Sequence, residues 1–71
     1  MDIVNSIIEY EMGELDAVDI IKLFAELIRT GQAWSLQGRY GRTARALIDR
    51  GYINEDGSIN EDIYNKLTGD Y

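Results

Sequence analysis

The strongest structural signal in this sequence is an apolar stripe at helical spacing between residues 16 and 31. Side chains in this segment are apolar at every third or fourth position, which is the period of one face of an α-helix. Asp16 is a good N-cap before the stripe, and Gly31 can take the left-handed conformation that ends many helices. The segment therefore predicts an amphipathic helix whose apolar residues are Ile20, Ile21, Phe24, Leu27 and Ile28.

Shorter stretches predict further helices on both sides of this one. Residues 2–12 also carry apolar residues at helical spacing, namely Ile3, Val4, Ile7, Ile8 and Met12. Residues 32–38 predict either a short helical turn or the first part of a longer helix. Residues 40–50 are more clearly helical and end at Gly51, and residues 61–68 follow Asn60, a good N-cap.

A turn separates the last two of these helices. Asp56-Gly57 is a turn dipeptide flanked by Ile53 and Ile59, which is typical of a short hairpin or an extended loop. Because there is no internal repeat or linker, residues 1–71 predict a single all-α domain. We expect a compact bundle of four to five short helices, with a small Asp-Gly turn or hairpin before the last helix.

Two glycines lower the helix propensity of the middle of the chain. Gly38 and Gly41 each cost about 1 kcal/mol relative to Ala in a helix interior. They predict either a helix break near residue 39 or a surface where another backbone comes close.

The chain lacks the side chains on which many catalytic and metal sites depend. Its 71 residues contain no Cys and no His, which removes disulfides, thiol chemistry and the usual acid–base residue. A calcium loop also fails, because aligning Gly57 with the loop glycine puts Tyr52 and Ile63 at ligand positions. We expect no catalytic residue, no cofactor and no metal site. Stability must come from apolar packing, and the sequence leaves open whether a second copy of the chain contributes.

The charges are unevenly distributed along the chain. A net charge of −6 opposes binding to DNA, RNA or anionic lipid. Acids dominate residues 1–26 and 54–71, whereas residues 27–53 carry five bases and one acid. No apolar run reaches the roughly 18 residues of a membrane span, and the N-terminus lacks signal-peptide features. These patterns predict a cytoplasmic protein whose arginines either pair with acids on neighbouring helices or contact a partner.

The most unusual cluster of side chains lies in the basic middle segment. Trp, Tyr and Arg are the residue types most enriched at binding hot spots. The alternative is that Trp34 and Tyr40 are core residues and that the arginines only balance internal acids. The candidate partner-binding residues are Trp34, Gln37, Arg39, Tyr40, Arg42 and Arg45.

A winged helix-turn-helix is an alternative interpretation of the same region. Residues 44–53 followed by Asp56-Gly57 look like a helix that runs into a small wing. Arg39, Arg42 and Arg45 would then supply phosphate contacts. The negative net charge and the lack of a further basic patch argue against duplex binding.

Residues 30–53 contain the elements Ala-Trp, Leu-Gln-Gly and Tyr-Gly-Arg, and the chain begins Met-Asp-Ile-Val-Asn. In these features, residues 1–53 resemble a family of short proteins encoded by tailed bacteriophages. The segment from Asn54 onward is not part of the resemblance. The family has no assigned biochemical activity, so the resemblance implies no functional residues. It implies a phage protein made inside a bacterium, in the host cell cytoplasm.

Our leading hypothesis is a non-catalytic phage protein that docks on a bacterial host protein through the surface from Trp34 to Arg42. Small acidic phage proteins without catalytic residues commonly act as adaptors or inhibitors of host machinery. By this analogy we expect a role in host takeover or anti-defence. The alternatives are the winged-helix-like nucleic-acid-binding protein and a small virion or assembly component.

Overall fold

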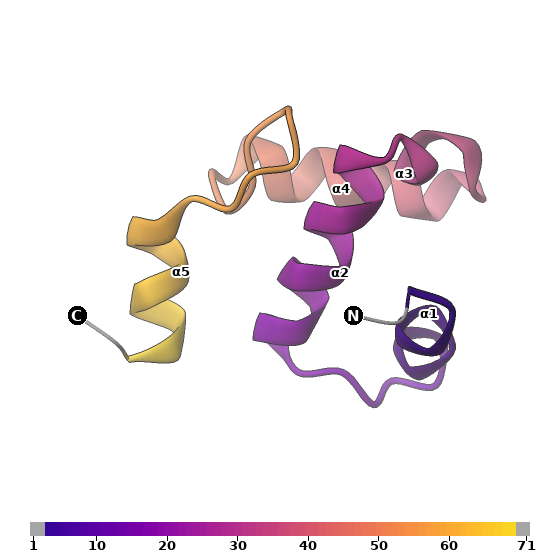
Figure 1. Cartoon of the computed structure of the whole chain (residues 1–71), viewed down its shortest axis with the longest axis horizontal. Coiled ribbons are helices and arrows are strands. Elements are labelled where there is room, and N and C mark those ends of the chain that lie inside the picture. The colour runs from indigo at the N-terminus through magenta and orange to yellow at the C-terminus, as the bar shows by residue number, and fades with distance from the viewer. Residues whose placement is uncertain (1–2, 70–71) are drawn as a thin grey trace.

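Residues 3–69 are described by this computed structural model, and they form five helices (Figure 1). An isolated antiparallel bridge between Ile53 and Ile59 makes a small hairpin before the last helix. The all-α prediction is confirmed, and residue 2 of the predicted first helix lies outside the described range. The helices are α1 (Ile3–Glu11), α2 (Ala17–Arg29), α3 (Gln32–Ser35), α4 (Gly38–Asp49) and α5 (Glu61–Thr68). Within residues 3–69, no helix has the length and apolar character needed to cross a membrane.

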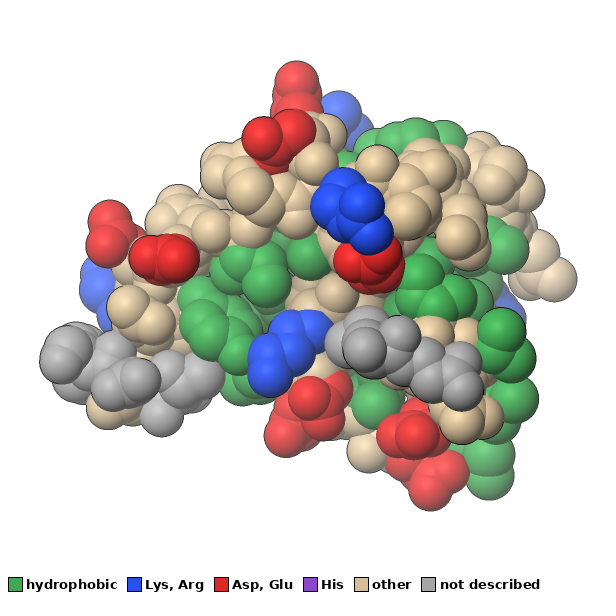
Figure 2. Space-filling view, in the orientation of Figure 1, with side chains coloured by type: hydrophobic (Ala, Val, Ile, Leu, Met, Phe, Trp, Pro, Cys, Tyr) green, Lys and Arg blue, Asp and Glu red, His purple; other side chains and the backbone are tan. Residues whose placement is uncertain are grey.

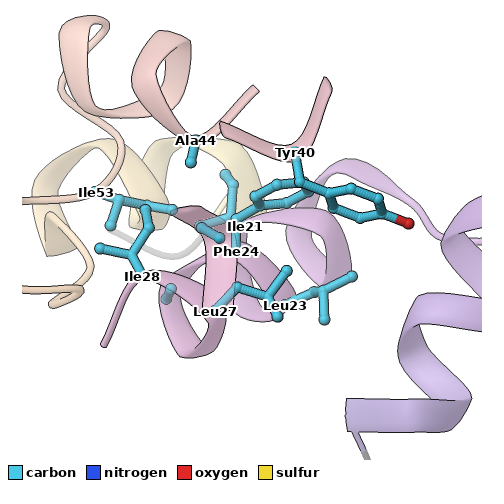
Figure 3. Close-up of a cluster of buried hydrophobic side chains, with 10 residues drawn as sticks. Ile21, Leu23, Phe24, Leu27, Ile28, Tyr40, Ala44 and Ile53 are labelled. Atoms are coloured by element: carbon cyan, nitrogen blue, oxygen red, sulfur yellow. The ribbon is translucent and has the colours of Figure 1, made fainter. Parts of the chain in front are cut away.

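Helix α2 is the centre of the fold. In Figure 1 it runs through the middle, with α1 on one side, α5 on the other and α3 and α4 across one end. Its start is capped by Asp16, whose Oδ1 accepts a hydrogen bond of 2.8 Å from the Asp19 N–H. Its end is followed by Gly31 at φ +82°, as the sequence predicts. The buried α2 side chains labelled in Figure 3 are Ile21, Leu23, Phe24, Leu27 and Ile28, and Ala25 is buried as well.

The break between α3 and α4 falls at Leu36 and Gln37, slightly earlier than the glycines predict. Leu36 has an extended backbone with ψ −177°, and Gln37 is the N-cap of α4. Gly38 and Gly41 both lie inside α4 and therefore do not form the break. A Cβ added at Gly41 would lie 3.6 Å from the carbonyl oxygen of Ala33, so a second backbone does come close there.

The end of α4 matches the sequence prediction. Gly51 has φ +82°, and the N–H of Tyr52 donates to the carbonyl oxygen of Leu47 at 3.0 Å. A left-handed residue after the helix, followed by an N–H that bonds to a carbonyl of the last helical turn, is a common way for a helix to end. Helix α4 buries Tyr40 and Ala44 against α2, as Figure 3 shows.

Helix α1 is attached to the core by one face without any fully buried residue. Its backbone comes close only to α2 among the described helices. Tyr10 packs edge-to-face on Phe24, with ring centroids 5.4 Å apart, and its ring lies 5.8 Å from that of Tyr40. Side chains also connect α1 to α4, because the Glu11 carboxylate accepts hydrogen bonds from the Tyr40 hydroxyl and the Arg39 guanidinium.

This junction changes the proton affinity of its acidic groups. The hydrogen bond from Tyr40, with a further contribution from Arg39, holds the pKa of Glu11 below its ordinary value. Burial, followed by the hydrogen bond to Glu11, raises the pKa of the Tyr40 hydroxyl. At neutral pH the hydroxyl therefore stays protonated and donates to an ionised carboxylate. Such charge-assisted hydrogen bonds are stronger than bonds between neutral groups.

The hairpin tip packs directly on the backbone of α2. The Gly57 N–H donates to the carbonyl oxygen of Asn54 at 2.9 Å, and Gly57 is buried at φ +92°. An added Cβ would lie 2.7 Å from the backbone nitrogen of Arg29 and 2.8 Å from the carbonyl oxygen of Ala25. Real Cβ atoms do not approach backbone atoms this closely, so only glycine fits at the tip.

We expect Gly57→Ala to lower the free energy of unfolding by about 2–5 kcal/mol, measured by urea denaturation. Left-handed strain of about 1–2 kcal/mol adds to an overpacking cost of about 1–3 kcal/mol. Gly31→Ala is the matched control, because φ is similar there and no atom lies within 4 Å of the added Cβ. Gly31→Ala should lower the free energy of unfolding only by the cost of the left-handed strain, about 1–2 kcal/mol. Equal losses at the two positions would contradict the tight contact between hairpin and α2.

We also expect Glu11→Gln to destabilise the protein at neutral pH, with a smaller effect in acid. Because folding lowers the pKa of Glu11, the ionised carboxylate stabilises the folded state above its unfolded-state pKa. That stabilisation is lost as the pH falls through the folded-state pKa. Denaturation curves at pH 7 and near pH 3 measure the difference between variant and wild type. For Glu9→Gln, an exposed change on the same helix, the difference in unfolding free energy from wild type should not depend on pH in this way. A difference that is the same at both pH values for Glu11→Gln would contradict the role of its charge.

Candidate functional site

Trp34 is the most prominent apolar side chain on the surface near α4. It lies on α3, and 51% of its surface is exposed. The neighbouring Ala33 is fully buried and anchors α3 to the core. Leu36, two residues further on, is 37% exposed. A large aromatic side chain held in place by a buried neighbour, and half open to solvent, has the properties of a binding hot spot.

The two glycines of α4 give Trp34 and Arg42 adjacent places on one helix face. A Cβ added at Gly41 would lie 3.8 Å from Cε3 of the Trp34 ring. One at Gly38 would lie 3.2 Å from Nη1 of Arg42. Positions three residues apart on a helix are neighbours, so Trp34 and Arg42 each lie against one of two neighbouring positions of α4. The chain's own side chains therefore occupy the space that the glycines leave.

Arg42 is exposed and makes no ion pair within residues 3–69. Gln37, five residues earlier, is also exposed, and its side chain makes no capping hydrogen bond at the start of α4. Both side chains therefore have hydrogen-bonding groups that a partner can reach. Together with Trp34 and Leu36 they form what we name the α3–α4 surface: Trp34, Leu36, Gln37 and Arg42.

The other three sequence candidates are used inside the fold. Tyr40 is only 4% exposed, and its ring stacks on Phe24 with a centroid distance of 6.0 Å. Arg39 pairs with Glu11 and lies over the Tyr40 ring, with its guanidinium carbon 5.4 Å from the centroid. Arg45 pairs with Asp49 and with Glu55 of the hairpin, both at 3.3 Å. Arg39 and Arg45 thus pair with acids of the same chain, as the alternative interpretation expects, whereas Arg42 does not.

The hairpin differs from a DNA-binding wing. Its tip is packed on α2 through Gly57, and it carries the acidic side chains of Glu55 and Asp56. Asp56 caps the turn, since its Oδ1 accepts from the N–H and the hydroxyl of Ser58 at 2.9 and 2.7 Å. Glu55 in turn engages Arg45. The hairpin therefore presents carboxylates, which repel DNA phosphates, where a DNA-binding wing would present Lys or Arg side chains.

A groove that the sequence does not predict lies between α2, the hairpin and α5. Its volume is about 540 Å³, and Ala25, Ile59 and Tyr64 contribute its apolar surface. Lys22, Glu26, Arg29 and Glu61 place charges around it, and Arg29 is paired with Glu26. Its lining comes from segments about thirty residues apart, so no local motif could reveal it. None of the six sequence candidates lines it.

Figure 2 shows the charges and the apolar side chains on one face of the molecule, with acidic and basic groups interspersed between apolar ones. Basic side chains on this face are scattered singly and do not form a continuous patch. On this face, the basic side chains therefore do not form the stripe that tracking of a nucleic-acid backbone requires.

Comparison with known protein families gives one match, which covers nearly the whole chain. The family described as "Domain of unknown function (DUF7417)" matches residues 1–68, so its match includes the hairpin and α5 as well as residues 1–53. Neither the curated proteins nor the solved structures contain a match to the chain. Because the match spans nearly every residue, the chain belongs to the DUF7417 family of domains of unknown function.

Proposed function

We propose that this protein is a non-catalytic bacteriophage protein that binds a bacterial host protein, as an inhibitor or adaptor in host takeover or anti-defence. The observation that carries the binding role is the half-exposed indole of Trp34, together with the exposed Arg42, which makes no ion pair within residues 3–69. The phage origin rests on the resemblance of residues 1–53 to short phage proteins. The host cytoplasm as the place of action follows from that origin.

The chemistry of the α3–α4 surface defines the kind of partner. Trp34 and Leu36 need an apolar recess, because their exposed area gains free energy when it is removed from water. The planar guanidinium of Arg42 matches a carboxylate in a bidentate arrangement. We therefore expect a protein surface with an apolar pocket bordered by Asp or Glu. Phosphates could also engage Arg42, but the chain's net charge of −6 opposes a nucleic-acid partner.

The test is capture of a partner from bacterial lysate with the tagged protein, followed by titration of the purified pair. Trp34→Ala and Arg42→Ala should each weaken binding by about 2 kcal/mol or more, which is a hot-spot loss. Isothermal calorimetry measures the dissociation constants, and circular dichroism checks that each variant is folded. Both side chains are exposed, so we expect both variants to fold.

Arg50→Ala provides the charge-matched control. Arg50 is also exposed, but it lies at the opposite end of α4. Its loss changes the net charge by the same amount and should leave binding unchanged. Normal binding by folded Trp34→Ala and Arg42→Ala variants would remove the α3–α4 surface from the proposal. Nuclease treatment of the lysate separates the alternatives, because capture that nuclease abolishes would favour the nucleic-acid-binding role.

A further inference from the structure

Helix α1 is held in place by partly buried side chains alone. It buries no residue fully, whereas α2, α3 and α4 each bury at least one. One face of α1 packs against the core through Ile3, Ile7 and Tyr10, and a second apolar face leaves Val4 and Ile8 exposed. Contacts along a single face therefore attach this helix to the rest of the molecule.

The sequence of α1 gives the helix little stability of its own. It has nine residues, fewer than the roughly 12–15 that an isolated helix needs even in a favourable sequence. Four of the nine are Ile or Val, whose branched side chains lower helix propensity. Glu9 and Glu11 lie in the last turn, where the helix dipole disfavours acids, and no base lies there to offset them. The helical state of α1 therefore depends on its contacts with α2 and α4.

The connection after α1 is built as a pivot. Gly13 has φ +73°, and no atom lies within 4 Å of a Cβ added there. The N–H groups of Gly13 and Glu14 donate to the carbonyl oxygens of Tyr10 and Glu9, at 3.0 and 2.9 Å, so this cap belongs to α1. Leu15 already packs against the core. A rotation between Glu14 and Leu15 would therefore move α1 together with its cap, at the open connection seen in Figure 1.

The closed position of α1 occupies groups that border the α3–α4 surface. The Glu11 carboxylate accepts from the Arg39 guanidinium and from the Tyr40 hydroxyl, and Tyr10 covers the Tyr40 ring. Arg39 lies three residues before Arg42 on α4, so the two positions are neighbours on that helix. Glu11 therefore makes, within the chain, the contact with Arg39 that a carboxylate of an acidic partner would make.

We propose that α1 is an autoinhibitory lid, which opens as a unit while α2, α3 and α4 stay folded and which, when closed, withholds Arg39 and Tyr40 from an acidic partner of the α3–α4 surface. The withholding rests on the proposed binding role of that surface, whereas the opening does not. In the open state Phe24 keeps its stacking on Tyr40, and Asp16 still caps α2. A partner that needs the open state binds with an affinity reduced by the fraction of molecules that are open.

Native-state hydrogen exchange of the full chain, followed by NMR, tests the opening. The amides of α1 should exchange through an opening at least about tenfold more frequent than that of the slowest amides of α2. Gly31→Ala strains the end of α2 and leaves every contact of α1 in place. It should accelerate the slowest α2 amides by about five- to thirtyfold and leave the α1 amides unchanged. Equal acceleration of both sets would show that α1 exchanges only by global unfolding, which would overturn the lid.

Glu11→Gln tests whether the contact with Arg39 and Tyr40 holds the lid closed. Glu9→Gln is the matched control, because it removes a carboxylate from the same helical turn. The α1 amides should exchange about two- to fivefold faster in Glu11→Gln than in Glu9→Gln, the range expected for an exposed ion pair. Equal rates in the two variants would overturn the role of Glu11.

The withholding of Arg39 is measured with phenylglyoxal, which modifies free guanidinium groups, followed by peptide mass spectrometry. Arg39 should react more slowly than Arg42 in the wild type, and Glu11→Gln should accelerate Arg39 about two- to fivefold without changing Arg42. Equal reactivity of the two arginines in the wild type would overturn the withholding. Neither this measurement nor hydrogen exchange needs a partner, so failure to capture a host protein would contradict the proposed function and leave the opening of α1 standing.

Discussion

The burial of α2 on several sides is the interaction on which the rest of the structure depends. Leu23, Phe24 and Leu27 of this helix have no exposed surface. Helices α1, α3, α4 and α5 all pack against it, and α1 and α5 have no other close helical neighbour among the described helices. A chain of 71 residues without Cys has no covalent cross-link to replace this packing. Small domains hold a narrow stability margin, so one well-covered helix is an efficient way to form a core.

Local signals in the sequence predict most of the helices because they act within a few residues. Asp16 caps α2 through a bond to the backbone three residues later, and Gly51 ends α4 through its own φ angle. The break at Leu36–Gln37 is different. Gly38 and Gly41 disfavour helix intrinsically, but Gly38 is only the first residue of α4, and Gly41 lies where the backbone of Ala33 in α3 comes close. Tertiary packing routinely overrides a propensity of this size.

The candidate site was predictable only in part, for the same reason. The composition of residues 34–42 indicates a binding surface, and the exposure of Trp34 and Arg42 agrees with that hypothesis. The alternative that Tyr40 is a core residue is confirmed, since it is 4% exposed and shares the inner face of α4 with Ala44. Its ring contacts with Phe24 and Tyr10 involve other helices, so the pattern within α4 does not show them. The same limit applies to α1, where apolar spacing predicts a helix but does not show that two separate faces are apolar.

The contact at Gly57 has a consequence for the whole C-terminal part of the molecule. The tip of the hairpin rests on α2 with only a hydrogen atom as its side chain, and Asn60 begins the capping of α5 three residues later. The position of α5 therefore depends on this contact as well as on the packing of α5 itself against α2. A displacement of the tip by one methyl group would also shift the start of α5. It would change the width of the groove between α2 and α5 without altering any residue of either helix.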